Sequence, residues 1–135
     1  MLKVLVVGSG AREHALVWKL SQSSQVAEIY AAPGNAGIAS TASILNIKPT
    51  DIAALAAAAR EHKIDLTVVG PEVPLAQGIV DLFESRGLRV FGPSKAAARI
   101  EASKVFAKEL MRKNGIPCAK SESFTSFEAA KSYVK

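Results

Sequence analysis

Apolar and polar positions alternate along this chain in blocks that predict strands followed by helices. Residues 2–7 form an apolar run, interrupted only by Lys3, which stops at a glycine and indicates a buried strand. Residues 11–21 then have apolar positions at helical spacing. A helix predicted at 50–62 should begin with Thr50 as its N-cap, and one predicted at 74–85 should end in a left-handed cap at Gly87. Similar patterns predict strands at 26–32, 43–47, 65–69 and 89–91, and helices at 50–62 and 74–85.

This order of elements predicts an α/β fold with an open, doubly wound parallel sheet of the Rossmann type. Strands that alternate with helices form parallel β-α-β units, and their crossovers are right-handed. Ligands of such sheets bind beyond the carboxyl ends of the strands. Glycine follows four of the predicted strands, in the sequences GSG (8–10), PGNAG (33–37), GPE (70–72) and GPS (92–94).

The character of the chain changes after Gly92. Residues 103–114 predict a basic helix with Lys104, Lys108 and Arg112 on one face, for which a solvated surface is the simplest interpretation. A strand is expected at 118–124, followed by a helix that starts at a capping box and reaches the final residue. We therefore divide the chain into an N-terminal domain, 1–100, and the start of a second domain, 101–135.

Composition limits the classes of function. A formal net charge of +5 and 49% hydrophobic residues fit a globular domain whose partner is nucleic acid, anionic lipid or a phosphorylated metabolite. The basic face lacks interleaved aromatic residues, which argues against nucleic acid. The apolar run at 2–7 is too short for a signal or a membrane span. The single cysteine, Cys118, excludes an intramolecular disulfide, and we expect a buried thiol in a cytoplasmic protein.

The first glycine loop departs from the dinucleotide-binding fingerprint. That fingerprint needs a third glycine, where this chain has Glu13, and an acid at the end of the second strand, which is also missing because Glu28 lies within the strand. An acid in the first helical turn suits an amine or sugar hydroxyls better than a phosphate. Glu13 could equally be a helix-terminal acid that only stabilises the fold, and the neighbouring Arg12 could be solvated or part of a site.

Glu72 brings a second carboxylate to the same expected crevice. Two acids suggest a polyhydroxylated or amino ligand, whereas hydrolysis by paired carboxylates is rare on this fold. Asn35 and Gly37 belong to a loop that either forms a simple turn or lines the ligand.

Five motifs, in order, resemble signatures of the phosphoribosylamine-glycine ligase family, also called glycinamide ribonucleotide synthetase. They are GSGAREHA (8–15), APGNAG (32–37), VVGPEVPL (68–75), FGPS (91–94) and EASKVFAK (101–108). The resemblance implies a pre-ATP-grasp domain followed by the beginning of an ATP-grasp domain. In this family ATP phosphorylates the glycine carboxylate, and the amine of 5-phosphoribosylamine then attacks the glycyl phosphate in de novo purine biosynthesis.

The resemblance also implies roles for individual residues. Lys104 would contact the nucleotide phosphate, and the ribosylamine would be bound by residues at the strand ends, with its hydroxyls or amine on the two acids. No catalytic residue and no metal ligand is expected in this chain, because ATP and Mg²⁺ (or Mn²⁺) need residues beyond 135. The 135 residues alone are therefore expected to be inactive. The expected substrate-binding residues are Gly10, Arg12, Glu13, Asn35, Gly37 and Glu72.

Two positions depart from the family pattern, since Ala11 and Ala102 stand where glycine is usual. Alanine at position 11 is favourable if the backbone there is already helical and costs about 1 kcal/mol if φ must be positive. We favour the helical interpretation, because a good helix pattern follows at once. A Rossmann-type nucleotide-binding module without chemistry is the alternative function, and the sequence leaves the oligomeric state open.

Overall fold

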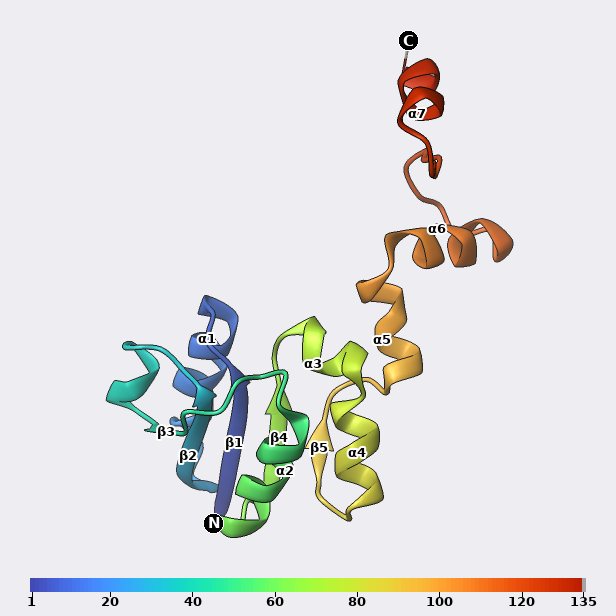
Figure 1. Ribbon diagram of the computed structural model, residues 1–135. Coiled ribbons are helices and arrows are strands. Elements are labelled where there is room, and N and C mark those ends of the chain that lie inside the picture. The colour runs from blue at the N-terminus through green and yellow to red at the C-terminus, as the bar shows by residue number, and fades with distance from the viewer. Residues whose placement is uncertain (135) are drawn as a thin grey trace. The chain divides into compact units, whose positions relative to one another are not determined.

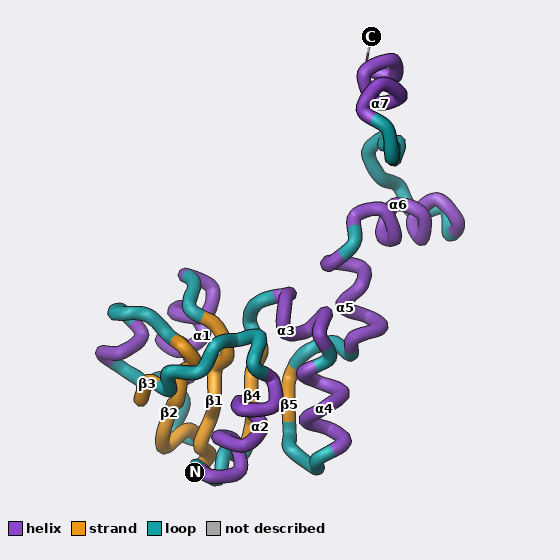
Figure 2. Tube along the Cα trace, viewed as in Figure 1, coloured by secondary structure: helices purple, strands orange, loops and turns teal. Residues whose placement is uncertain are grey.

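The computed structural model describes residues 1–134, which form two compact units, Met1–Ala98 and the residues from Arg99 onward (Figure 1). In the first unit, five parallel strands form one sheet in the order β3-β2-β1-β4-β5 (Figure 2). The fold class expected from the sequence is confirmed. The strands are β1 (Leu2–Gly8), β2 (Val26–Pro33), β3 (Ser43–Ile44), β4 (Leu66–Val69) and β5 (Val90–Phe91).

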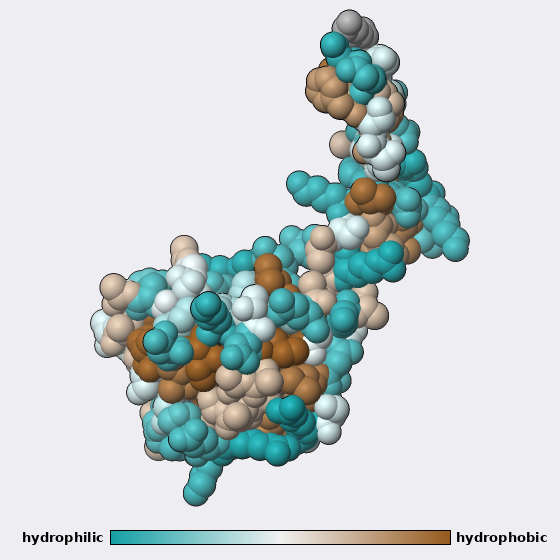
Figure 3. Space-filling view, in the orientation of Figure 1, coloured by the Kyte–Doolittle hydropathy of each residue, from teal (hydrophilic) through white to brown (hydrophobic). Residues whose placement is uncertain are grey.

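Helices cover both faces of this sheet because the central strand is apolar on both sides. In β1, Leu5 and Val7 point to one face, where they pack with α2 (Ile52–Glu61) and α4 (Ile79–Ser85). Val4 and Val6 point to the opposite face, which α1 (Ala11–Leu20) covers. Figure 3 shows apolar surface on the face that carries α2, with hydrophilic surface above and below it.

Several local expectations need correction in the first unit. Asp51, not Thr50, caps α2, because its Oδ1 accepts the Ala54 N–H at 3.1 Å.

The single helix expected at 74–85 is two helices, α3 (Glu72–Gln77) and α4, divided at Gly78, where φ is 95°. The cap expected at Gly87 is confirmed, with φ 68°. The 3₁₀ turn η1 (Ile38–Ser40) and the helix α5 (Lys95–Ala102) were not predicted.

The second unit contains the basic helix predicted from the sequence, α6 (Lys104–Lys113), with Ser103 as its N-cap. Arg99 lies over the Phe106 ring at 4.0 Å. The strand expected at 118–124 is wrong: Figure 2 shows this stretch as loop up to α7 (Phe127–Val134). Cys118 is exposed rather than buried, since its loop joins no sheet among the described residues. The last residue of the predicted final helix, 135, lies outside the described residues.

The strand order determines where a site can form in the first unit. The chain moves outward from β1 through β2 to β3, then returns to the other side of β1 to form β4 and β5. The point where the direction reverses therefore lies between β1 and β4, and crevices of open α/β sheets form there, beyond the carboxyl ends of the strands. Within the described part of the chain, no helix has both the length and the apolar character to cross a membrane.

Candidate functional site

The loop after β1 leads directly into α1 and positions its acid. Gly8 ends the strand with φ 128°, a conformation that glycine adopts without strain, and Gly10 is the N-cap of α1. Glu13 is the third residue of the helix, and its Oε2 accepts the Gly10 N–H at 2.7 Å. This bond is the glutamate half of a capping box. The Gly10 amide is consequently already occupied by a carboxylate.

The Glu13 side chain is buried between the ends of β1 and β4. The residue is 3% exposed, although it lies in the first turn of a surface helix. A β-carbon at Gly8 would lie 2.5 Å from Glu13 Cγ, and one at Gly70 would overlap Glu13 Oε1. Both neighbouring backbones therefore have to be glycine for the carboxylate to occupy this position.

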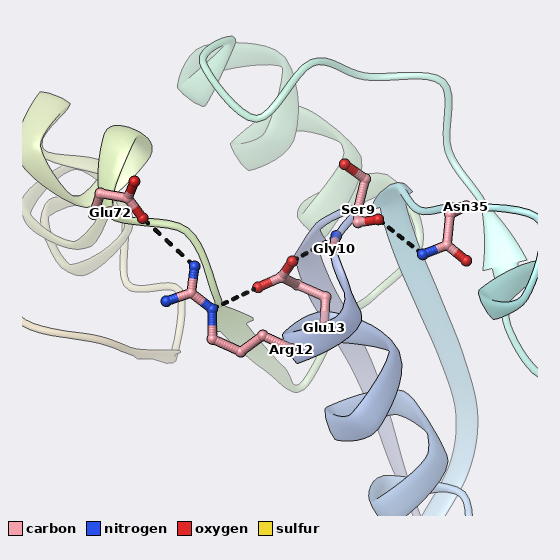
Figure 4. Close-up of polar contacts among 6 residues, drawn as sticks. All are labelled: Ser9, Gly10, Arg12, Glu13, Asn35 and Glu72. Atoms are coloured by element: carbon pink, nitrogen blue, oxygen red, sulfur yellow. Dashed lines mark hydrogen bonds and ion pairs between the residues drawn. The ribbon is translucent and has the colours of Figure 1, made fainter.

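Arg12 joins the two predicted acids of the crevice. Its Nε lies 3.3 Å from Glu13 Oε1, and its Nη2 lies 3.5 Å from Glu72 Oε2. Figure 4 shows the guanidinium between the two carboxylates, one from α1 and one from the first residue of α3. The structure thus brings together Arg12, Glu13 and Glu72, as expected for residues at adjacent strand ends.

The environment of Glu72 favours its ionised form. A hydrogen bond from its own backbone N–H and, more weakly, the Arg12 guanidinium hold the pKa of the Glu72 carboxyl below its ordinary value of 4.5. The Glu72 side chain is half exposed, in contrast to that of Glu13. It is thus an anionic acceptor that a ligand can reach from solvent.

The loop after β2 is tied to the same crevice by Asn35. Its Nδ2 donates to the Ser9 carbonyl at 2.8 Å (Figure 4). Its Oδ1 accepts the Ile38 N–H at 2.9 Å. Gly37 lies beside the exposed His14 ring, since a β-carbon at Gly37 would be 2.5 Å from His14 Cε1. Asn35 therefore adjoins the first loop and Gly37 adjoins α1, and the visible role of the Asn35 side chain is to hold the two loops together.

Lys104, the predicted nucleotide contact, is the first residue of α6 and is exposed. It belongs to the second unit, and its role stays a prediction.

Sequence reasoning missed three contributors to the crevice: Gly8 and Gly70, which make room for Glu13, and the Ser9 carbonyl. The sequence shows the glycines at the strand ends. It does not show that Glu13 needs the space beside them, because this depends on β1 and β4 being neighbouring strands. Together, the ends of β1 and β4 present the two carboxylates, the Arg12 guanidinium and the loop that the Asn35 side chain holds against Ser9. Such groups can bind amines and hydroxyls through hydrogen bonds.

Comparison with known proteins identifies the family of the chain. Residues 2–101 match the family described as Phosphoribosylglycinamide synthetase, N domain. The chain belongs to this family. The resemblance inferred from the five sequence motifs is thereby confirmed.

Curated relatives of the synthetase family extend over nearly the whole chain. A phosphoribosylamine-glycine ligase of Halalkalibacterium halodurans is 54% identical over 134 residues, which are 99% of this chain and 31% of that protein. The ligase of Ralstonia nicotianae is 53% identical over 133 residues, 98% of this chain and 32% of that protein. The chain thus spans about a third of the length of these relatives.

Solved structures show the same fold. The phosphoribosylamine-glycine ligase of Thermotoga maritima superimposes with a TM-score of 0.68 at 28% identity, covering 98% of this chain and 30% of that one. The N5-carboxyaminoimidazole ribonucleotide synthetase of the same organism gives a TM-score of 0.71 at 17% identity, covering 98% and 36%. The second likeness extends to the fold alone.

Proposed function

We propose that this chain is the N-terminal part of an ATP-dependent ligase that joins glycine to 5-phosphoribosylamine, forming glycinamide ribonucleotide, ADP and phosphate in purine biosynthesis. In this reaction the glycine carboxylate is first phosphorylated by ATP. The amine of phosphoribosylamine then attacks the acyl carbon, and phosphate leaves. The first unit binds the ribosylamine, and the ligase works in the cytoplasm.

The observation that supports this proposal most strongly is the junction of Glu13 and Glu72 through Arg12 at the carboxyl ends of β1 and β4. An amino sugar offers amine and hydroxyl donors, for which two carboxylates are suitable acceptors. Membership in the synthetase family, whose name contains the glycinamide product, points to the same ligand class. Glu72 is exposed and accepts from ribose hydroxyls, whereas Glu13 lies deeper, toward the amine.

A dinucleotide-binding module receives less support. The Gly10 N–H, which a bound phosphate would need at the start of α1, donates to Glu13 instead. The carboxylate also stabilises the positive end of the helix that a pyrophosphate would otherwise neutralise.

Among residues 1–134, no three His, Cys, Asp or Glu side chains gather in a group that could hold a metal ion. We therefore assign no step in this chain to the metal. Lys104 is proposed to contact the ATP phosphate, and the remaining ATP and magnesium contacts belong to parts of the ligase beyond residue 135.

A chimera tests the proposal directly. Residues 1–134 of this chain replace the matching segment of the Halalkalibacterium halodurans ligase, with which they share 54% identity. ADP release that requires both glycine and phosphoribosylamine, at a rate near that of the parent, is the expected result. A second chimera with the corresponding Ralstonia nicotianae segment shows whether the exchange itself is tolerated. The proposal would be contradicted if the control chimera is active while the chimera with this chain is folded but inactive.

A further inference from the structure

Glu13 has one carboxylate oxygen that is not satisfied by the protein. Oε2 accepts the Gly10 N–H, but Oε1 is buried and has no hydrogen-bond donor among the described residues. A buried carboxylate oxygen without a donor is unfavourable, because it has lost its water without gaining a replacement. An atom in this state beside the carboxyl ends of β1 and β4, the ligand-binding position of the fold, points to a donor that a ligand supplies.

Arg12 occupies the approach to this oxygen without satisfying it. Its Nε is 3.3 Å from Glu13 Oε1, as an ion pair that lacks the alignment of a hydrogen bond. The Arg12 side chain is 65% exposed, and its second ion pair, with Glu72, is 3.5 Å long. The pair with Glu72 is exposed on both sides and therefore weak, so the guanidinium gives up that contact at little cost. The pair with Glu13 involves a buried carboxylate, so Arg12 leaves it only when another donor takes its place.

The two partners differ in freedom of movement. Glu13 is held between the backbones of Gly8 and Gly70 and by its bond to Gly10. Arg12 extends into solvent on a flexible side chain. A ligand that competes for the space between the carboxylates would therefore displace Arg12 and leave Glu13 in place.

We propose that Arg12 is a displaceable internal occupant of the space beside Glu13 Oε1, and that the amino group of the ligand takes this space and donates the hydrogen bond that the oxygen lacks. A neutral amino group, the form that can attack the acyl carbon, is compact and offers two N–H donors, and it fits a single buried oxygen better than the planar guanidinium does. The inference rests on the proposed function and adds that Glu13 distinguishes an amine from a hydroxyl at the same position. Arg12 lowers the apparent affinity for the amine, because the ligand must first displace it.

Two stable probes that differ in one group test this inference by calorimetry on the 135-residue chain. Both are cyclopentane analogues of ribose 5-phosphate with the diol and phosphate retained. One has an amino group in place of the anomeric hydroxyl, and the other keeps the hydroxyl. The ratio of their dissociation constants cancels contacts to the shared phosphate and diol.

Arg12→Met removes the charge but keeps an unbranched, helix-favouring side chain. We expect it to increase the preference for the amine by about two- to fivefold, the change that loss of an exposed ion pair allows. Arg12→Lys keeps a cation beside Glu13 and should not increase that preference. Arg86→Met, at an exposed arginine outside the crevice, is the charge-matched control and should leave the ratio unchanged.

The position of Arg12 provides a second measurement. In the ¹⁵N spectrum of the arginine side chains, the Arg12 Nε–H signal should move when the amine probe binds and move less with the hydroxyl probe. Glu13→Gln should abolish the preference for the amine.

The outcomes separate this inference from the proposed function. If both probes bind but Arg12→Met leaves their ratio unchanged or lowers it, Arg12 is not a competing occupant and the inference is wrong, while ribosylamine binding stands. If the unmodified chain binds neither probe, the proposed ribosylamine site is wrong and the inference fails with it.

Discussion

Gly70 lies against Glu13 so closely that a single added carbon at Gly70 would overlap the Glu13 carboxylate. The two residues are far apart in sequence and meet because β1 and β4 are neighbouring strands. The backbone of Gly70 is not among those with positive φ, so its lack of a side chain is explained by space alone. The glycine at the end of β4 is therefore a requirement of the crevice rather than of the turn.

Gly70→Ala tests this relationship. The variant should be destabilised by about 1–3 kcal/mol, as expected for overpacking against the buried Glu13 side chain, and should bind the amine probe more weakly. Adding Glu13→Ala removes the overlapping group, so the double variant should lose less stability than the sum of the two single variants. Denaturant unfolding of the four proteins measures the coupling, and simple additivity would show that the two residues do not compete for space.

Ala11→Gly tests the departure from the family pattern at the start of α1. Ala11 is the first helical residue and has no positive φ, so the helical interpretation of this position is confirmed. Glycine there should lower the free energy of unfolding by at most about 1 kcal/mol, and with it the melting temperature slightly. It should not strengthen binding of the amine probe. A gain in affinity would mean that the usual family glycine serves the ligand.

Lys63 provides an independent test of the fold. It is the one non-glycine residue with positive φ among residues 1–134, at 54°, and it follows α2 in the position where Gly87 follows α4. In both places the next residue donates a backbone N–H back to the helix, Ile64 to Ala59 and Leu88 to Phe83. Lys63→Gly should therefore raise the free energy of unfolding by up to about 1 kcal/mol.

The reciprocal change, Gly87→Ala, should lower the free energy of unfolding by a similar amount. Its β-carbon would meet no atom within 4 Å, so the cost comes from the backbone alone. Thermal unfolding of both variants under the same conditions is the measurement. Shifts in the same direction would be inconsistent with the two caps described here.

The pair Lys3 and Glu28 predicts a pH dependence of stability. Lys3 Nζ lies 2.8 Å from Glu28 Oε1, and the Tyr30 hydroxyl donates to the other oxygen at 2.9 Å. These two bonds, that of Lys3 first, lower the pKa of the Glu28 carboxyl below its ordinary value of 4.5. A carboxyl with a lowered pKa stabilises the fold above its unfolded pKa, and the contribution is lost as the pH falls through the folded pKa.

At alkaline pH the same cluster loses its stabilising contribution as the pH rises instead of as it falls. The pKa values of Lys3 and Tyr30 are raised above 10.5 and 10.0, chiefly by their hydrogen bonds to Glu28, so their contribution is lost as the pH rises through these raised values. Lys3→Met should therefore return the Glu28 pKa toward its ordinary value in a ¹³C NMR titration. Lys19→Met, which removes another exposed lysine, should not change it.

The sequence predicted the sheet well where patterns are local. Residues 2–33 have a buried strand, a glycine turn and an amphipathic helix in direct succession, and each was placed within about one residue. The helix at 74–85 was predicted as one element because apolar spacing continues across Gly78, whereas its positive φ ends one helix and starts another. The strand at 118–124 was wrong because a short apolar alternation forms a strand only where a partner strand is available.

The candidate site was predictable in its residue types but not in its connections. Glu13 and Glu72 could be assigned to one crevice because they follow strands of a parallel sheet. The bridge from Arg12 to Glu72 spans 60 residues, and that from Asn35 to Ser9 spans 26. Such pairings depend on which strands become neighbours, and a single sequence does not specify that.

The kinetic effect of Glu72→Gln in the chimeric ligase tests the ribosylamine crevice most directly, with Glu61→Gln on the exposed end of α2 as the matched control. Loss of a charged hydrogen-bond acceptor should raise the KM for phosphoribosylamine by about tenfold or more, while the KM values for glycine and ATP change by less than about twofold. Glu61→Gln should leave all three KM values unchanged. Equal increases of the three KM values in Glu72→Gln would contradict the assignment of the ribosylamine to this crevice.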